Sequence, residues 1–194
     1  MAELVQGWGF TLAALVLITG VFGYAVYSLR SELQYIKALT DFLGQELARD
    51  EPGAETVPAR GPVPLLIHEI RDEAKAIATA RDAAWSNKQV RGWQMRTQRL
   101  EPALAFWVDF LRQLGLLFTV VGLGLSLAVE GASVDQLLAP LGLAVWTTVA
   151  GLGFSIWLTA QFGMTIPVWN DTCEKNIEAW DSSRRARRTT SGDR

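Results

Sequence analysis

The placement of basic residues around three long apolar segments constrains this chain more than any other feature of its sequence. All eighteen Lys and Arg residues lie either between Arg30 and Arg112 or from Lys175 onward. The apolar segments cover residues 8–29, about 110–129 and about 137–160. Each segment reaches the length of about 20 residues that a helix needs to cross the hydrocarbon core of a bilayer. The sequence therefore predicts an all-α membrane protein with three transmembrane helices.

The same charge distribution predicts an orientation in the membrane. Short cytoplasmic segments carry an excess of Lys and Arg, so residues 30–102 and the C-terminal tail are expected in the cytoplasm. Because three spans place the two chain ends on opposite sides, Met1 and the turn at 130–136 are expected outside. The first apolar segment follows no basic residue and exceeds the apolar core of a signal peptide, about 7–15 residues. It is therefore expected to remain as a membrane anchor.

Helical periodicity predicts long cytoplasmic extensions of the spans. Apolar residues recur at helical spacing on two faces. The first face consists of Leu29, Leu33, Ile36, Leu43 and Leu47, and the second of Leu66, Ile70, Ile77 and Ala84. The linker at 50–64 contains four prolines and two glycines, which sustain neither helix nor strand. A second helix is expected to begin near Leu65 and, from about Ala74, to run unbroken into the second span, with a kink at Pro102.

The chain is expected to divide into four segments. These are the first transmembrane helix at 1–29, a cytoplasmic helical hairpin at 30–102, the second and third transmembrane helices at 103–165, and a cytoplasmic C-terminal helix with a basic tail at 166–194. The tail carries four arginines at 184–188. This cluster is expected to enforce the orientation, and attraction to anionic membrane lipids is the functional alternative.

The few polar atoms of the second and third spans fall on one face of each helix. The second span contributes Gly115, Thr119, Gly122 and Ser126, and the third contributes Thr148, Gly151, Ser155 and Thr159, with Thr147 beside them. Small residues on a membrane helix favour close packing against a neighbouring helix. Hydroxyls on the same faces add a second possibility, a wet or ion-lined path. Spacing alone favours packing over conduction.

Asp109 and Arg112 stand three residues apart at the inner boundary of the second span. Residues at this spacing face the same side of a helix and can form an ion pair. Such a pair is expected to help set the depth of the helix. A role in ion movement is the alternative.

Two sequence motifs carry a resemblance to a known family. Residues 114–122, LGLLFTVVG, are similar to the LGLLGTVxG signature of the MotA/TolQ/ExbB proton-channel family, and residues 144–152, AVWTTVAGL, resemble its ALxTTAxGL segment in the following span. Three spans and a short cytoplasmic region resemble the TolQ/ExbB branch more than the four-span MotA branch. The chain departs from the motifs at Phe118, where glycine is usual, and at Leu143, where an acid is common.

The resemblance implies a function, a site and partners. Members form a ring of five subunits in the bacterial inner membrane around two copies of a single-span partner of the TolR, ExbD or MotB type. The partner brings the ion-carrying aspartate, and ion flow drives rotation. By resemblance, Thr119 and Thr148 face the ion pathway, with Thr147 less securely placed. Ser126 and Ser155 extend the same hydroxyl faces. Residues 8–29, 110–129 and 137–160 contain no Asp or Glu, so the partner is expected to supply the acid that carries the ion.

Other classes of function have little support in the sequence. The single histidine, His68, has no Ser, Cys or acidic constellation of a catalytic base, so the chain is not expected to be an enzyme. The single cysteine, Cys173, excludes an intramolecular disulfide and a multi-cysteine metal site, and no motif for a cofactor is present. Nucleic-acid binding is not expected, because residues 30–102 carry eleven acidic and eleven basic side chains. The rival functions are a non-conducting membrane scaffold and a self-sufficient small channel.

Overall fold

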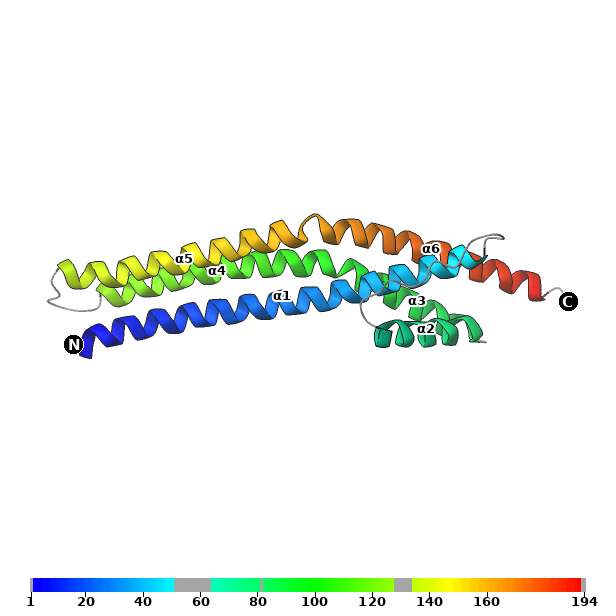
Figure 1. Ribbon diagram of the computed structural model, residues 1–194, viewed down its shortest axis with the longest axis horizontal. Coiled ribbons are helices and arrows are strands. Elements are labelled where there is room, and N and C mark those ends of the chain that lie inside the picture. The colour runs from blue at the N-terminus through cyan, green and yellow to red at the C-terminus, as the bar shows by residue number, and fades with distance from the viewer. Residues whose placement is uncertain (1, 51–63, 81, 128–133, 193–194) are drawn as a thin grey trace. The chain divides into compact units, whose positions relative to one another are not determined.

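The computed structural model describes residues 2–50, 64–80, 82–127 and 134–192, and these residues are almost entirely helical (Figure 1). The helices are α1 (Ala2–Asp50), α2 (Pro64–Thr79), α3 (Ala83–Gln98), α4 (Leu100–Leu127), α5 (Val134–Phe162) and α6 (Thr165–Gly192). No strand occurs within the described ranges. The predicted all-α fold is therefore confirmed.

Three helical segments are long and apolar enough to cross a membrane. They are Leu12–Arg49, Ala83–Gly124 and Val145–Arg187. Each contains apolar residues of one predicted span, so the structure has the helices expected of a multi-pass membrane protein. The predicted turn at 130–136 lies mostly outside the described residues, as does the linker at 50–64.

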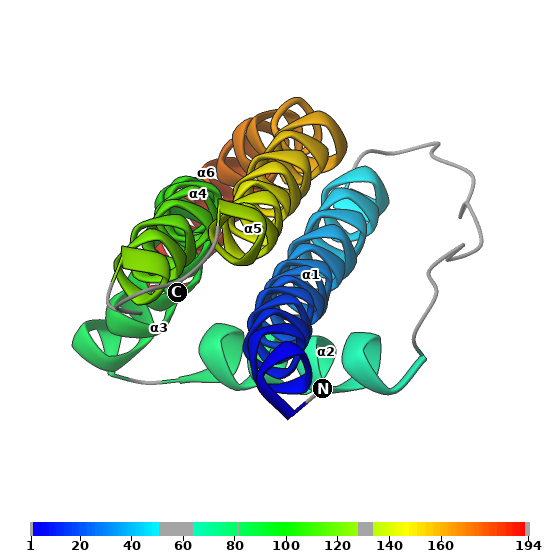
Figure 2. The same cartoon turned by 90° about the vertical axis from the view of Figure 1, so that its left-hand side faces the viewer.

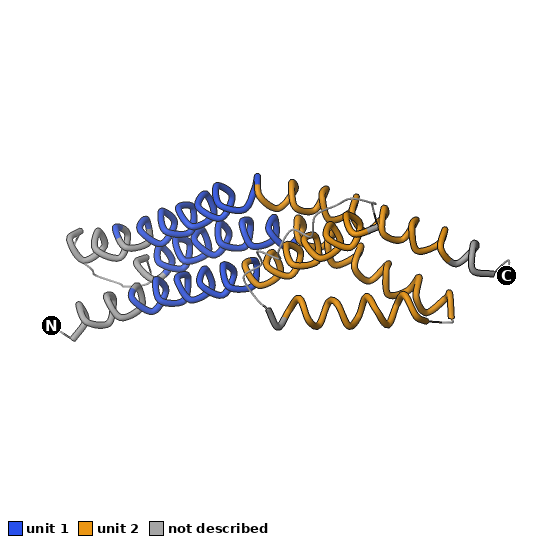
Figure 3. Tube along the Cα trace, turned by 45° about the vertical axis from the view of Figure 1, so that its right-hand side comes forward, with its two compact units in different colours: residues 1–29, 103–164 blue, residues 30–102, 165–194 orange. Residues whose placement is uncertain are grey.

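The chain forms two compact units, coloured separately in Figure 3. Unit 1 contains residues 1–29 and 103–164, and unit 2 contains residues 30–102 and 165–194. Helix α1 contributes its first part to unit 1 and its second part to unit 2. Each unit is therefore built from segments that are far apart in the sequence.

Unit 1 consists of the first part of α1 together with α4 and α5. Helices α4 and α5 lie side by side in both ribbon views (Figures 1 and 2). The ring of Phe22 on α1 stacks on Phe154 of α5, with 4.2 Å between ring centroids. Tyr24 meets Trp107 of α4 edge to face at 5.7 Å. Aromatic contacts thus connect α1 to both of the other helices in this unit.

Unit 2 has a conventional apolar core built by the second part of α1 together with α2, α3 and α6. Its fully buried side chains include Ile36, Leu39, Leu43, Ile70, Ile77, Ile166, Cys173 and Ile177. The Asn176 amide of α6 donates to the Thr40 carbonyl of α1 at 3.1 Å. The predicted hairpin of residues 30–102 therefore shares its core with the C-terminal helix.

The prediction of one unbroken helix from about residue 74 into the second span is wrong. Helix α2 ends at Thr79 and α3 begins at Ala83. The Asp82 carboxylate accepts a hydrogen bond from the backbone N–H of Ala84 at 2.8 Å, which caps the new helix. Ala84 thus belongs to α3, where it is exposed, and not to the apolar face of the preceding helix.

Helix α4 follows α3 with only Arg99 between them. Arg99 has right-handed helical backbone angles, and its N–H bonds the Met95 carbonyl at 3.2 Å. Pro102 follows within the first turn of α4. A proline is tolerated in a first turn because the N–H that it lacks would have no acceptor within the helix.

Candidate functional site between helices α4 and α5

The two helices that carry the motifs touch through glycine. A Cβ atom at Gly151 would lie 2.7 Å from the Leu111 carbonyl oxygen and 3.0 Å from the Gly115 Cα. A Cβ at Gly115 would in turn lie 3.0 Å from the Thr147 carbonyl oxygen. Backbone meets backbone here, and only residues without a side chain permit this distance. The predicted packing residues Gly115 and Gly151 therefore lie together.

The two threonines of the motifs lie beside this glycine contact. The hydroxyls of Thr119 and Thr148 share a hydrogen bond across the helix pair. Thr119 also donates to the Gly115 carbonyl at 3.1 Å, and the Thr148 hydroxyl lies 3.4 Å from the same oxygen. Both threonines are half-buried, whereas Thr147 is fully buried. The hydroxyl oxygens of Thr119 and Thr148 and the carbonyl oxygen of Gly115 thus cluster where the two helices meet.

The remaining residues of the predicted path are dispersed along the helices. Ser155 is buried, and its hydroxyl donates to the Leu152 carbonyl at 2.8 Å. Gly122 is also buried, on α4. Ser126 belongs to α4, but its side chain lies outside the described part of the chain. The structure therefore brings together Thr119 and Thr148, and it places Ser155 about two helical turns farther along α5.

The predicted ion pair forms, although not at the helix contact. Arg112 Nη1 lies 3.7 Å from Asp109 Oδ1, and both side chains are exposed. Leu111, between them in sequence, is fully buried and turns its carbonyl toward Gly151. Asp109 and Arg112 thus occupy the outer face of α4, while the intervening residue faces α5.

Two residues of this region were not singled out by sequence reasoning. Phe22 and Phe154 stack on one another, and Trp157 meets Phe22 edge to face at 5.3 Å. In an apolar segment a phenylalanine is indistinguishable from any lipid-facing residue, so the sequence contains no signal for this contact. Trp146 of α5 is exposed.

The single histidine and the single cysteine belong to unit 2 and not to this contact. No group of three His, Cys, Asp or Glu side chains within the described ranges could hold a metal ion. His68 is exposed on α2, with its Nδ1 3.3 Å from the Asp72 carboxylate. Cys173 is fully buried in unit 2, and its sulfur lies 3.9 Å from the Thr97 hydroxyl. Burial of this kind keeps a thiol away from solvent oxidants and electrophiles.

Comparison of the chain with protein-family models, curated proteins and solved structures gives no match. The resemblance to the MotA/TolQ/ExbB family therefore rests on the two motifs. Both motifs contribute directly to the contact between α4 and α5, through Gly115 and Thr119 in one and Thr148 and Gly151 in the other.

Proposed function

We propose that this protein is a subunit of an ion-driven membrane motor. It forms a ring, a pentamer by resemblance, around two copies of a single-span partner that carries an aspartate in its membrane helix. Ions, most simply protons, pass between the partner and the threonines of α4 and α5. The ion motive force is thereby converted into rotation or mechanical work.

The observation that carries this proposal is the Thr119–Thr148 hydroxyl pair. The two residues come from different motifs, yet their hydroxyls share a hydrogen bond beside the Gly115 carbonyl. Neutral oxygens in this arrangement can replace water around a moving ion or hold a water that relays a proton. The two motifs therefore meet where neutral oxygens are available to an ion or to a water that relays a proton.

The absence of acids from the spans supports the need for a partner. Residues 8–29, 110–129 and 137–160 contain no Asp or Glu. A proton carrier in a membrane needs a group that titrates, and Asp, Glu or His residues usually provide it. An aspartate from a second polypeptide would supply that group next to the hydroxyl pair.

Exposed glycines in unit 1 support assembly into an oligomer. A Cβ atom at five of them would meet nothing within 4 Å in the described part of the chain: Gly20, Gly23, Gly124, Gly142 and Gly153. Glycine costs about 1 kcal/mol relative to alanine inside a helix. In membranes this cost is offset where a neighbouring helix approaches closely. Neighbouring subunits or the partner would provide such helices.

The proposed orientation places Met1 outside and unit 2, with the C-terminal tail, in the cytoplasm of a bacterial cell. The support is the placement of all Lys and Arg residues within 30–112 and 175–194. Reporter fusions at Met1 and Arg194 test the orientation. A periplasm-only reporter that is active at Arg194 contradicts it.

The function is tested with the complex purified from its native membranes through a tag on the full-length chain. Native mass spectrometry should find five copies with two copies of a single-span protein that has an aspartate in its apolar segment. A stable monomer rules out the ring. The complex is then reconstituted in vesicles, and proton and sodium flux are measured separately.

Thr119→Val and Thr148→Val each remove a hydroxyl and nearly keep the shape of the side chain. Both complexes should assemble normally and lose most of the flux. Thr11→Val is the matched control, because Thr11 belongs to the first apolar segment and to neither motif. If both motif variants conduct as well as the parent, the two hydroxyls do not line an ion path.

A non-conducting scaffold is the second candidate, and one observation favours it. The Thr119 and Thr148 hydroxyls are bonded to each other and to Gly115 within the chain, as expected of groups that fasten two helices together. Interhelical hydrogen bonds in membranes contribute about 0.6 kcal/mol on average. Failure of the valine variants to assemble, together with absence of flux in the parent, would support the scaffold.

A further inference from the structure

Unit 2 contains a basic cavity that the proposed motor function does not explain. The cavity has a volume of about 650 Å³ and lies among α1, α2 and α6, within the range of about 300–1,000 Å³ that is typical of small-molecule sites. Its charged lining consists of Arg49, Arg71, Lys75, Arg184, Arg187 and one carboxylate, Glu46. Positive charge thus predominates around a space large enough for a ligand.

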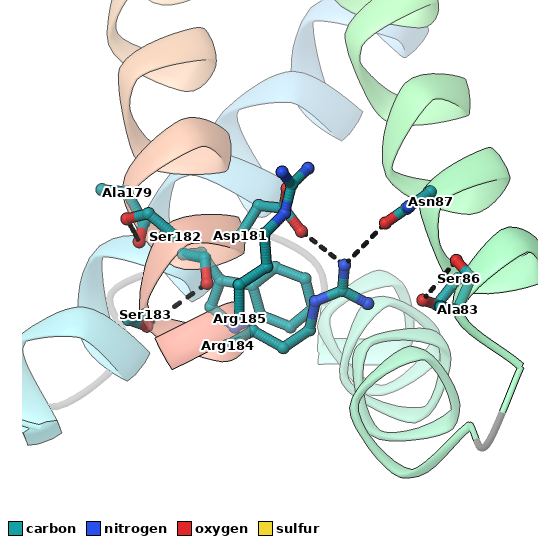
Figure 4. Close-up of polar contacts among 10 residues, drawn as sticks. Ala83, Ser86, Asn87, Ala179, Asp181, Ser182, Ser183, Arg184 and Arg185 are labelled. Carbon is teal, nitrogen blue, oxygen red and sulfur yellow. Dashed lines mark hydrogen bonds and ion pairs between the residues drawn. The ribbon is translucent and has the colours of Figure 1, made fainter. Parts of the chain in front are cut away.

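Arg184 is the buried group of this cavity. Its Nη2 donates to Asp181 Oδ1 at 2.5 Å and to Asn87 Oδ1 at 3.2 Å (Figure 4). The residue is only 5% exposed, and its Nε and Nη1 are buried with no hydrogen-bond partner in the described part of the chain. Asp181 also forms an ion pair with Arg185, in which Arg185 Nη2 lies 2.5 Å from Asp181 Oδ2. Buried polar atoms in native proteins nearly always have a partner, so two Arg184 donors require an acceptor.

Two pairs of like charges converge on the same space. Arg71 and Lys75 stand four residues apart on α2, and Arg184 and Arg187 stand three apart on α6. Like charges at these spacings repel and destabilise a helix. Neither Arg71 nor Lys75 forms an ion pair with a described residue. An anion between α2 and α6 would relieve the repulsion between Arg71 and Lys75 on α2.

We propose that this cavity binds a phosphate-bearing anion. Guanidinium groups are favoured ligands of phosphoryl oxygens, and Nε and Nη1 of Arg184, on different edges of its guanidinium, each have an N–H to donate. Arg71 and Lys75 neutralise the remaining charge. Trp180 and Phe42, which also line the cavity, provide an apolar wall for the non-phosphate part of the ligand. The phosphate belongs either to a soluble compound or to a lipid headgroup.

The first test measures binding of inorganic pyrophosphate to the full-length protein in detergent by isothermal titration calorimetry at low salt. The parent should bind one pyrophosphate per chain. Arg71→Gln combined with Lys75→Gln should weaken binding about tenfold or more, because charged hydrogen bonds are lost. Lys88→Gln combined with Arg91→Gln is the matched control. It removes two exposed charges from α3 that do not line the cavity, and it should leave the affinity within about twofold.

Arg184→Lys sharpens the assignment, because it keeps a positive charge beside Asp181 and removes the Nε and Nη1 donors of the guanidinium. It should weaken pyrophosphate binding while the melting temperature confirms that the protein is folded. Equal affinities for the two double variants, or no pyrophosphate binding together with a negative lipid result, overturn the proposal. Neither result bears on ion flux, so the proposed motor function is judged separately.

The second test identifies the source of the phosphate. The protein is extracted from nanodiscs made of equal parts phosphatidylcholine and phosphatidylglycerol, and retained lipid is counted by native mass spectrometry. Retention of phosphatidylglycerol by the parent, with loss in the Arg71→Gln, Lys75→Gln variant, supports a headgroup ligand. Pyrophosphate binding without retained phosphatidylglycerol supports a soluble phosphate compound. Lipid retention that is equal in both double variants, without pyrophosphate binding, contradicts the site.

Discussion

The two units expose different kinds of residue. In unit 1 large apolar side chains such as Val16, Trp146 and Ile156 are exposed, while the closest helix contact is made by glycines and hydroxyls. In unit 2 apolar side chains such as Leu39 and Ile77 are fully buried, and most charged side chains are exposed. Helix α1 shows both patterns, one in each of its parts.

The difference reflects the solvent around each unit. In water, burial of apolar surface is the main driving force of folding. In a bilayer the lipid is as apolar as leucine, so helices associate through close packing and interhelical hydrogen bonds instead. A unit that exposes its large apolar residues and joins its helices by backbone contact is suited to lipid. The same substitution should therefore have different consequences in the two units.

The largest difference is expected for truncation of leucine in α1. Leu39, in unit 2, is 0% exposed, whereas Leu12, in unit 1, is 58% exposed. Leu39→Ala should destabilise unit 2 by about 2–5 kcal/mol, because a cavity forms and apolar contacts are lost. Leu12→Ala should change stability by less than about 1 kcal/mol, because lipid fills the space. Hydrogen exchange of peptides from α3 and α6 measures the first effect. Equal effects of the two variants would contradict the comparison.

A lysine introduced at an exposed position should have a large effect in unit 1 and a small effect in unit 2. Val149, near the middle of α5, is 51% exposed, and Met95, on α3, is 56% exposed. Val149→Lys should raise the apparent free energy of membrane insertion by about 2.5–3.5 kcal/mol. Met95→Lys should leave folding and insertion within about 0.5 kcal/mol of the parent. A translocon insertion assay compares the two, and efficient insertion of the Val149 variant would place this face of α5 in water.

The helices were predictable from the sequence to the extent that length and apolarity determine them. Uninterrupted apolar segments produce helices long enough to span a membrane, and periodicity identified the buried residues Ile36, Ile70 and Ile77. The break at residues 80–82 was missed, because only Asp82 signals it. A single capping residue is weaker evidence than the periodicity on both sides of it, and the structure decides in favour of the cap.

The candidate sites were predictable only where local spacing was informative. The small-residue faces of α4 and α5 follow from spacing, but the contact between Thr119 and Thr148 depends on the rotation of two helices. Gly151 and Gly153 are both glycines of α5 and look alike in the sequence, yet only Gly151 contacts the backbone of another helix. The basic cavity could not be foreseen, because Arg71 and Arg184 come from distant parts of the sequence. Neither residue belongs to a sequence motif that would link it to the other.

Alanine substitutions at Gly151 and Gly153 test the packing of unit 1, and the expected change in stability is intermediate in size. Gly151→Ala should destabilise the α4–α5 contact by about 1–3 kcal/mol, because overpacking forces the backbones apart. Gly153→Ala meets open space and should be neutral or slightly stabilising, through its higher helix propensity. Thermal denaturation of the detergent-solubilised protein gives the ranking. A tolerated Gly151→Ala would show that the two helices do not depend on this close approach.

The smallest expected effect belongs to an ion pair in unit 2. Arg96 Nε lies 2.9 Å from Glu32 Oε2 and its Nη2 lies 3.3 Å from Oε1, with both side chains partly exposed. A double-mutant cycle with Glu32→Gln and Arg96→Gln should give a coupling of about 0.2–1 kcal/mol, because water screens exposed pairs. The cycle separates this coupling from the stacking of Arg96 on Tyr35, whose ring centroid lies 3.7 Å from the guanidinium carbon. Salt should reduce the coupling further, while the Gly151→Ala effect in unit 1 should not change with salt. A coupling that persists in high salt would mean that this part of unit 2 is shielded from water, and the contrast between the two units would then be weaker than their exposed residues indicate.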